Sequence, residues 1–576
     1  METRRSAPPT IHGLLSCLYP VESANALHSR IEKRLSTALE CVKQRDESAM
    51  WRSSDIVLIT YANSFSSHDT TPLETLKNLL LDWFPGLFKQ VHLLPFYPYT
   101  SDDGFSVSDY RRVDAVHGDW SDIESLSDEV ELVFDYVINH GSSAHARFQE
   151  FLEDRPPGNR FFKTAPAESD VSRVTRPRAA PLLQAYDTAK GTQHVWCTFS
   201  RDQVDWDFSN PDVLYEFIDV FIMYIERGAT WLRIDAIAYL WKELGTSCVH
   251  LPQTHTVVKL LRAIAEKISP AIKLLTETNV PLAENLSYFG QGDEAHIVYN
   301  FSLPPLLTHA LLTGDGNTLS TWCQQLPQLE SGCTFLNFTA SHDGIGLRPA
   351  EGILDDTQLS ELVECIETFG GRLTHRTQAD GSLSPYEANI SLFDAFKGTV
   401  AGEDEWQVER FLSSQCVMMT LTGVPAVYYN SLFGAPNDQE GVKRTGRNRT
   451  INRRKWTLEE LESRLKAPNS ASKRVFDGMK SLIAARQSQP AFHPEGSQEC
   501  MMLHPALFVL LRTAPTGRQA LLCLSNLRHS EVSVSWASVP LESCGVRAVF
   551  TQGDVFLGSD TITFSPYAAL WLDITP

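Results

Sequence analysis

The amino-acid sequence predicts an α/β fold whose core is a barrel of eight parallel strands. Short, strongly apolar runs recur along the first three quarters of the chain, and most are separated by segments whose apolar residues recur at helical spacing. Buried strands that alternate with helices form a parallel sheet, and eight such units suggest a closed (β/α)8 barrel of the TIM type. The candidate strands are residues 55–60, 91–95, 131–135, 230–235, 272–277, 296–300, 334–338 and 424–429.

The chain begins with a segment that precedes the barrel. Apolar residues recur at helical spacing between residues 22 and 45, so residues 1–50 are predicted to form an N-terminal helical extension. The barrel is then assigned in three parts. These parts are residues 51–140, 206–343 and 411–494, and they include clear helical patterns at residues 213–225 and 256–268.

Two long segments interrupt the barrel, both on the side where its strands end. About seventy residues with little periodicity follow the third strand, and a compact domain rarely holds a structureless loop of that length. Residues 141–205 are therefore predicted to fold as an inserted subdomain over the barrel mouth. Residues 344–410 are predicted to form a second insertion late in the barrel.

The last part of the chain has a different pattern. From about residue 495 the apolar runs are short and typical of strands, as in 507–511, 520–524, 546–550 and 570–572. Residues 495–576 are therefore predicted to form a small antiparallel β domain.

Composition excludes several classes of partner. The chain of 576 residues has a formal net charge of −20, which opposes binding to nucleic acid or to an anionic membrane. No apolar run approaches the roughly 20 residues that span a bilayer, and the N-terminus has no pattern of a secretory signal. The eleven cysteines include no Cys-x-x-Cys pair and suit reduced thiols, so we expect a cytoplasmic protein. A monomer and a homodimer both remain open.

Two acidic residues stand at the ends of predicted strands. Asp235 ends the run 230–235, and Glu277 ends the run 272–277. Each acid alone could simply cap the helix that follows its strand. Two carboxylates delivered into one pocket at the strand ends are, however, what chemistry at an anomeric carbon requires. Other polar residues that follow predicted strands would join them at the same rim: Asp102, Asp103, Asn139, His140, Arg233, His342 and Asp343.

The order of these motifs resembles the α-amylase superfamily of glycoside hydrolases and transglycosidases (glycoside hydrolase family 13). The matching segments are residues 134–140, 231–235, 275–277 and 339–343. The resemblance implies Asp235 as the nucleophile, Glu277 as the general acid/base and Asp343 as a carboxylate that grips sugar hydroxyls. It also implies that Arg233 orients Asp235 and that His140 and His342 donate to hydroxyls. In that mechanism Glu277 needs a raised pKa, whereas Arg233 favours the ionised form of Asp235.

Finer features resemble the sucrose phosphorylase branch of this superfamily, in which inorganic phosphate is a co-substrate. They include Gly104-Phe, Ser108-Asp-Tyr, Arg176-Pro-Arg, Gly245-Thr-Ser-Cys and Leu303-Pro-Pro-Leu-Leu. The resemblance implies a glucose pocket of Asp102, Phe105, His140, His342 and Arg453, with Phe199 and Tyr239 as walls. It implies phosphate binding by Arg176, Arg178 and Tyr386, although two arginines in an insertion could also be a solvated basic face. The sequence shows no nucleotide-binding glycine motif and no metal-ligand spacing, so we expect neither a cofactor nor a metal.

Three departures from the sucrose enzymes concern the acceptor. They are Ser384-Pro-Tyr-Glu, Thr276-Glu-Thr-Asn-Val-Pro and a strongly cationic stretch at residues 443–455. They resemble the glucosylglycerate phosphorylases, which implies reversible phosphorolysis of 2-O-α-D-glucosylglycerate through a β-glucosyl-enzyme on Asp235. Arg449 would then grip the acceptor carboxylate, since a guanidinium can bind both oxygens, and Glu387 would recognise acceptor hydroxyls.

Several rival functions share the same catalytic parts. They are a sucrose, sucrose 6′-phosphate or glucosylglycerol phosphorylase, and an α-glucosidase or transglucosidase. The arginine-rich stretch could equally grip the phosphate of sucrose 6′-phosphate. A non-catalytic relative is disfavoured, because such chains lose one or more of the carboxylates that stand here at Asp235, Glu277 and Asp343.

Overall fold

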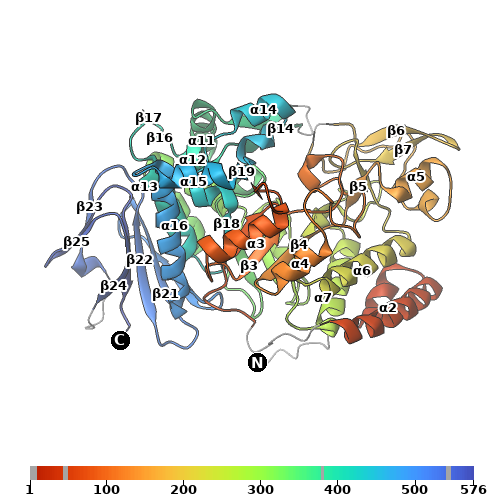
Figure 1. The fold of residues 1–576 in the computed structure, drawn as a ribbon, viewed down its shortest axis with the longest axis horizontal. Helices are drawn as coiled ribbons and strands as arrows, with labels where there is room; N and C mark the ends of the chain where they lie inside the picture. The colour runs from red at the N-terminus through yellow and green to blue at the C-terminus, as the bar shows by residue number, and fades with distance from the viewer. Residues whose placement is uncertain (1–9, 43–49, 179, 378–381, 540–545, 576) are drawn as a thin grey trace.

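Eight parallel strands close into a barrel at the centre of the protein (Figure 1). The structure is a computed structural model, and it describes residues 10–42, 50–178, 180–377, 382–539 and 546–575. All eight predicted strands are confirmed, and they follow one another around the barrel in chain order until the last pairs with the first. The strands are β1 (Val57–Thr60), β3 (Gln90–Leu93), β4 (Glu131–Val137), β9 (Ala229–Asp235), β10 (Lys273–Thr276), β11 (Ile297–Tyr299), β12 (Thr334–Phe338) and β18 (Val424–Tyr428).

Helices cover the outside of the barrel and bury an apolar face against it. They include α3 (Pro72–Trp83), α4 (Trp120–Ser127), α6 (Pro211–Glu226), α7 (Pro252–Ile268), α9 (Leu303–Thr313), α13 (Gln407–Thr420) and α16 (Ala471–Gln487). The start of α6 shows how the sequence determines where a helix begins. Pro211 occupies the first turn, and the Asn210 side chain accepts from the Asp212 N–H, which satisfies one of the free amides there.

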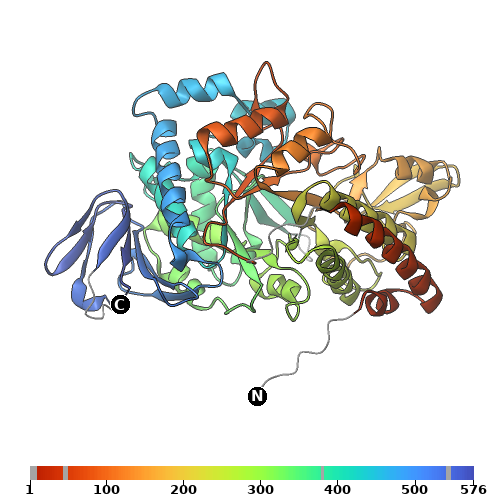
Figure 2. The same cartoon turned by 60° about the horizontal axis from the view of Figure 1, so that its bottom comes forward.

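The N-terminal extension packs against the side of the barrel. Helices α1 (Ile11–Leu18) and α2 (Val21–Cys41) lie along α6 and α7 (Figure 2). Leu27, Ile31 and Leu35 form the buried face of α2, while Arg34 pairs with Asp219 and Glu226 of α6. The predicted helix 22–45 agrees with α2, and its end at residues 43–45 lies outside the described residues.

The segment between β4 and α6 forms a separate layer at the barrel mouth. It holds β5 (His140–Ser142), α5 (Ala146–Leu152), the hairpin of β6 (Leu183–Thr188) and β7 (Gly191–Trp196), and β8 (Gln203–Asp205), which pairs with β5. One buried cation ties this layer to the barrel side. The Lys242 ammonium lies 3.0 Å from Asp205 Oδ2 and donates to Asn139 Oδ1 at 2.8 Å.

A second layer follows β12 and adds a small antiparallel sheet. Its strands are β13 (Ile345–Gly346), β15 (Leu383–Asn389) and β14 (Arg372–Thr377), in that order, with α11 (Asp356–Thr368) between β13 and β14 along the chain. Strand β15 lies beside the short 3-10 helix η7 (Asn448–Asn452). These two elements carry Tyr386, Glu387 and Arg449 to the mouth of the barrel.

The predicted antiparallel β domain is confirmed at the end of the chain (Figure 2). One sheet has the order β20 (Ser497–Met501), β21 (Leu507–Thr513), β22 (Ala520–Asn526), β27 (Ala569–Asp573) and β24 (Arg547–Gln552). A second sheet has the order β23 (Val532–Ser535), β26 (Thr561–Phe564) and β25 (Val555–Leu557). Apolar side chains from both sheets, among them Val509, Leu522, Ile562 and Leu570, pack into one core.

Two fully buried arginines join this domain and the last barrel helix to the base of the barrel. Arg486 of α16 donates to the carbonyls of Met419, Ser53, Gly423 and Phe492. Arg512 of β21 donates in the same way to backbone carbonyls, those of Ser497, Thr420 and His493. Each guanidinium therefore crosslinks several loops through main-chain atoms alone.

Candidate active site

A pocket opens at the carboxyl end of the barrel strands, between the barrel and its two added layers. Twelve of the sixteen residues for which the sequence predicts a catalytic or binding role line this pocket. They are Asp102, Phe105, His140, Arg178, Phe199, Asp235, Tyr239, Glu277, His342, Asp343, Tyr386 and Arg449.

Asp235 is held by an ion-pair chain that continues into the barrel. Arg233 Nη1 donates to Asp235 Oδ1 at 2.8 Å and also bonds to Asp135, which in turn accepts from His92. Arg233 and Asp135 are buried, and Arg233 lies behind Asp235 rather than in the pocket wall. Burial raises the pKa of Asp235, and Arg233 and His140 oppose that effect only in part. Arg233 thus favours the ionised form, as predicted, but does not fully outweigh burial.

Glu277 comes directly after β10 and beside Asp235. Strands β9 and β10 pair in parallel with Ile234 opposite Thr276, so the two acids leave neighbouring strand ends, about 5 Å apart in backbone position. The Ala236 N–H donates to Glu277 Oε2 at 3.3 Å. Burial, with the charges of Asp235 and Asp343, raises the pKa of Glu277 to about 7 despite the opposing effect of Arg233. Near neutral pH this carboxyl can therefore both give and take a proton.

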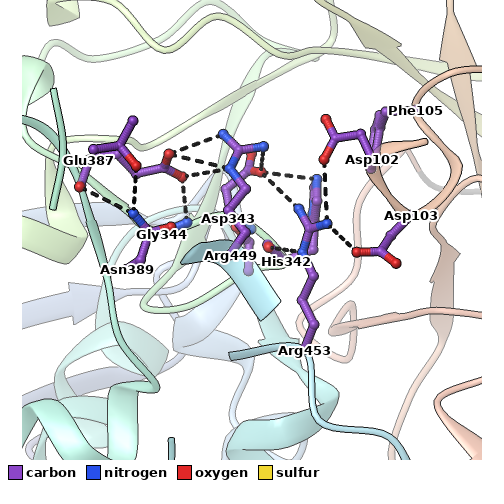
Figure 3. A network of polar contacts seen from close by, with 12 residues as sticks. Asp102, Asp103, Phe105, His342, Asp343, Gly344, Glu387, Asn389, Arg449 and Arg453 are labelled. Carbon is purple, nitrogen blue, oxygen red and sulfur yellow. Dashed lines mark hydrogen bonds and ion pairs between the residues drawn. The ribbon is translucent and has the colours of Figure 1, made fainter. Parts of the chain in front are cut away.

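Asp343 belongs to a row of alternating charges that crosses the rim (Figure 3). Arg449 Nη1 lies 2.5 Å from Asp343 Oδ1, and Arg453 Nη2 lies 3.7 Å from the same oxygen. On the far sides of the row, Arg449 pairs with Glu387, and Arg453 pairs with Asp103 at 2.7 Å. Burial alone would raise the pKa of Asp343, but Arg449, His342 and Arg453 outweigh it and lower the pKa well below its usual range. Asp343 is therefore ionised at any working pH.

An aromatic and strained turn forms the next part of the wall. The ring of Phe105 stacks on His342 with 4.7 Å between ring centres, and burial lowers the pKa of His342 to about 3, so this imidazole is neutral. Asp102 and Asp103 both have φ near +50°, a region that non-glycine residues rarely adopt. Gly104 follows with φ +113°, and a Cβ there would come within 2.6 Å of the Pro95 carbonyl oxygen. This backbone holds Asp102 at the pocket while Asp103 meets Arg453.

Side chains from the two added layers form the outer wall. Phe199 contacts His140 and Tyr239 through ring contacts at 5.0 and 5.6 Å between centres. The Arg178 guanidinium lies over the Tyr386 ring, 5.8 Å from its centre. Among the contacts of the described residues, Arg178 pairs with no carboxylate, so it is a pocket cation whose charge is available.

The other four residues with a predicted catalytic or binding role do not line the pocket. Arg233, Glu387 and Arg453 stand directly behind residues that do. The Glu387 carboxylate is occupied by Arg449 and by the Gly344 N–H at 2.7 Å, in place of the free acceptor contact that the sequence predicts. Arg176 bonds to the Ala180 carbonyl within the insertion.

Several lining residues escape the sequence prediction. Gln203 of β8 donates to the Phe105 carbonyl and contacts His140, and Asn279 follows Glu277 in the wall. Asp103, which the sequence places at the rim without a role, is the partner of Arg453. The segment Thr276-Glu-Thr-Asn could have pointed to Asn279, because it departs from the sucrose enzymes there. Nothing in the sequence around Gln203 gives a comparable signal.

The described residues offer no alternative centre for metal chemistry. Within them, no three His, Cys, Asp or Glu side chains gather in a way that could hold a metal ion. Helices in the described ranges are also too short or too polar to cross a lipid bilayer.

The fold and the site define this protein as a barrel enzyme, because its closed parallel barrel brings three carboxylates together at the ends of the strands. Residues 70–338 match the family model described as "Alpha amylase, catalytic domain". The chain belongs to the α-amylase family, as its motifs predict, and within that family it is a glycosyl-transferring phosphorylase enzyme.

Individual relatives show which members of this family the chain resembles. The chain is 41% identical over 573 residues to a glucosylglycerate phosphorylase of Spirochaeta thermophila, covering 97% of each chain, and 38% identical to one of Escherichia coli, covering 94% and 96%. It is 29% identical to a sucrose phosphorylase of Bifidobacterium adolescentis, over 76% of this chain and 86% of that one. A solved sucrose 6F-phosphate phosphorylase from Thermoanaerobacter thermosaccharolyticum shares the fold with a TM-score of 0.72, at 23% identity over 84% and 96% of the two chains.

Proposed function

We propose that this protein is a retaining glucoside phosphorylase that acts on 2-O-α-D-glucosylglycerate. The products are α-D-glucose 1-phosphate and D-glycerate, and the reaction is reversible. The observation that carries this proposal is the similarity over nearly full length to relatives named glucosylglycerate phosphorylase, at 38–41% identity, against 29% over a shorter span for the sucrose enzyme. The pocket supplies the groups that such a reaction needs.

In the first half-reaction Asp235 attacks the anomeric carbon. Glu277, in its protonated form, donates its proton to the glycosidic oxygen. Glycerate therefore leaves with that oxygen as a neutral hydroxyl group. The product is a covalent β-glucosyl ester on Asp235. A pKa of about 7 for Glu277 supports this role, because a substantial fraction of the carboxyl is protonated near neutral pH. Asp343, which stays ionised, is proposed to hold sugar hydroxyls as the ring distorts.

In the second half-reaction phosphate attacks the same carbon from the face that glycerate has left. Glu277, now ionised, accepts a proton from phosphate, and the Asp235 ester bond breaks to give α-glucose 1-phosphate. Two inversions at one carbon keep the α configuration. Asp102, Phe105, His140 and His342 are proposed to form the glucose subsite, with Arg453 behind Asp343 and with Phe199 and Tyr239 around the sugar.

Both co-substrates are anions, so the pocket needs an available cation. Arg178 lines the pocket and has no carboxylate partner among the described contacts, whereas the guanidinium of Arg449 already pairs with two carboxylates. We therefore propose that Arg178, with the Tyr386 hydroxyl, binds phosphate and the glycerate carboxylate in turn. Inorganic phosphate is then a co-substrate, and neither a cofactor nor a metal is required.

Cellular context is part of the same proposal. The ten cysteines of the described residues form no disulfide with one another, which suits a reducing compartment such as the cytoplasm. The proposal holds for a monomer and for a homodimer alike.

The test is a parallel assay of acceptors with α-glucose 1-phosphate as donor. D-glycerate, fructose, fructose 6-phosphate, glycerol and a tube without acceptor are compared by phosphate release, with Asp235→Asn as the inactive control. Release that is strongest with glycerate supports the proposal. Release that is strongest with fructose 6-phosphate reassigns the acceptor to a sugar phosphate, and equal release in every tube makes water the acceptor and the protein a hydrolase.

A further inference from the structure

Arg449 offers different edges of its guanidinium to two carboxylates. Its Nε lies 3.0 Å from Glu387 Oε1, and Nε and Nη2 each donate to Glu387 Oε2 at 3.3 Å. The closest approach of Arg449 to Asp343 is made by Nη1, which lies 2.5 Å from Oδ1. The Nε–Nη2 edge is one that can bind both oxygens of a carboxylate at once. Glu387 therefore occupies the edge with which Arg449 could otherwise bind Asp343 through both oxygens.

The contacts of Asp343 are correspondingly one-sided. Its neighbours, the cationic Arg449 and Arg453 and the neutral His342, all make their closest approach at Oδ1, at 2.5, 3.7 and 3.6 Å. Within the described part of the chain, none of these three groups makes its closest approach at the second oxygen, Oδ2. Because Asp343 lines the pocket, this arrangement leaves one carboxylate oxygen for a ligand.

Glu387 is itself held firmly in place. It is 2% exposed and lies on β15, where Gly346 of β13 and Thr374 of β14 flank it in the sheet. The Gly344 N–H donates to its Oε1 at 2.7 Å, and a Cβ on Gly344 would meet the Glu387 side chain at 2.7 Å. The backbone next to Asp343 therefore packs directly on the residue that anchors Arg449.

We propose that Glu387 is a positioning residue that acts through Arg449 on Asp343 and keeps Oδ2 of Asp343 open to the sugar. This inference rests on the proposed role of Asp343 in holding sugar hydroxyls. Without a charge at position 387, Arg449 would turn its two-donor edge onto Asp343, since paired hydrogen bonds to a carboxylate are the stronger geometry. The sugar would then have to displace an ion pair before it could bind.

The experiment is a double-mutant cycle on the donor step alone. Fluoride release from α-glucosyl fluoride is measured for the wild type, Glu387→Gln, Arg449→Gln and the double variant, with thermal unfolding as a check on folding. The exposed Glu364→Gln on α11 is the matched control. A glutamine at 387 can still accept from Gly344, so the substitution removes the charge and leaves that contact possible.

We expect Glu387→Gln to lower kcat/KM for the fluoride about tenfold or more, and to lower it by less than about twofold when Arg449 is already glutamine. An equal loss in both backgrounds overturns the proposal, because Glu387 would then act through Gly344 or the sheet. Unchanged fluoride release together with a raised KM for glycerate also overturns it and makes Glu387 an acceptor contact. If the wild type releases fluoride but does not use glycerate as an acceptor, the proposed acceptor is refuted, and the double-mutant cycle can still be interpreted. A wild type that releases no fluoride refutes both.

Discussion

The two ends of the barrel stabilise buried arginines in opposite ways. At the carboxyl end, Arg453 is 5% exposed and pairs with Asp103 and Asp102, and the partly buried Arg449 pairs with Asp343 and Glu387. At the base, Arg512 is fully buried, and every partner described for it is a backbone carbonyl. Burial alone would lower the pKa in both places. Carboxylates reverse that effect on the pKa of Arg449, and Tyr61 together with carboxylates reverses it for Arg453, whereas the pKa of Arg512 remains lowered.

This difference separates a region that can rearrange from one that cannot. A carboxylate partner can be replaced by a sugar hydroxyl or an anion when a ligand enters, because side chains turn about single bonds. A backbone carbonyl moves only if its loop moves. We therefore expect substitutions at the rim to change activity with little effect on stability, and substitutions at the base to do the reverse.

The largest effect is expected at Asp235. Asp235→Asn keeps the size of the side chain and removes the proposed nucleophile, so turnover of α-glucose 1-phosphate should fall by about 10⁴-fold or more. The free energy of unfolding, from denaturant titration, should change by less than about 1 kcal/mol. A variant that retains wild-type turnover would refute the covalent mechanism. A variant that fails to fold would contradict the expectation that substitutions at the rim have little effect on stability.

At the base, Arg512→Met should lower the free energy of unfolding by about 3 kcal/mol, because several buried carbonyls lose their donor. Its kcat, corrected for the folded fraction, should stay within about twofold of the wild type. Arg518→Met, at an exposed site in the same domain, is the matched control for denaturant titration. A normal stability with a low kcat would reverse the assignment of roles.

A smaller effect is expected for the available pocket cation. Arg178→Gln should raise the KM for phosphate and for glycerate about tenfold each, because both anions lose a charged hydrogen bond. Hydrolysis of α-glucosyl fluoride, which needs neither anion, should be unchanged. Arg176→Gln provides the comparison within the same insertion and should shift either KM by less than about twofold. Equal effects of Arg178→Gln and Arg176→Gln would indicate that phosphate is bound by a basic face that both residues share.

The pH dependence should be the mildest of these tests. Glu277, the proposed acid, has a pKa raised to about 7 and can donate only when protonated, so kcat/KM for glucosylglycerate should fall about tenfold per pH unit above 7. α-Glucosyl fluoride has a leaving group that needs no proton, and its kcat/KM should lack this alkaline fall. The same fall with both donors would assign the titration to another group.

Much of the fold is predictable because its strands are short, apolar and buried on both faces. The hairpin of β6 and β7 is missed, since its residues are largely half-exposed and lack a clean alternation. Asp235 and Glu277 are predictable as neighbours because parallel strands bring their carboxyl ends to one edge. The partners of Arg449 are not, since Glu387 is sixty-two positions away along the chain and only tertiary packing brings them together.

The tie between Lys242, Asp205 and Asn139 has a consequence for how the enzyme tolerates its surroundings. The positive charge that fastens the outer layer to the barrel is covalently part of the chain, so it has no dissociation constant and cannot be diluted away. Phosphate and hydroxy acids sequester divalent ions, and a junction held by such an ion would weaken as these compounds accumulate. A junction held by lysine is indifferent to them, so the shape of the pocket mouth is decoupled from the concentration of the compounds proposed to pass through it.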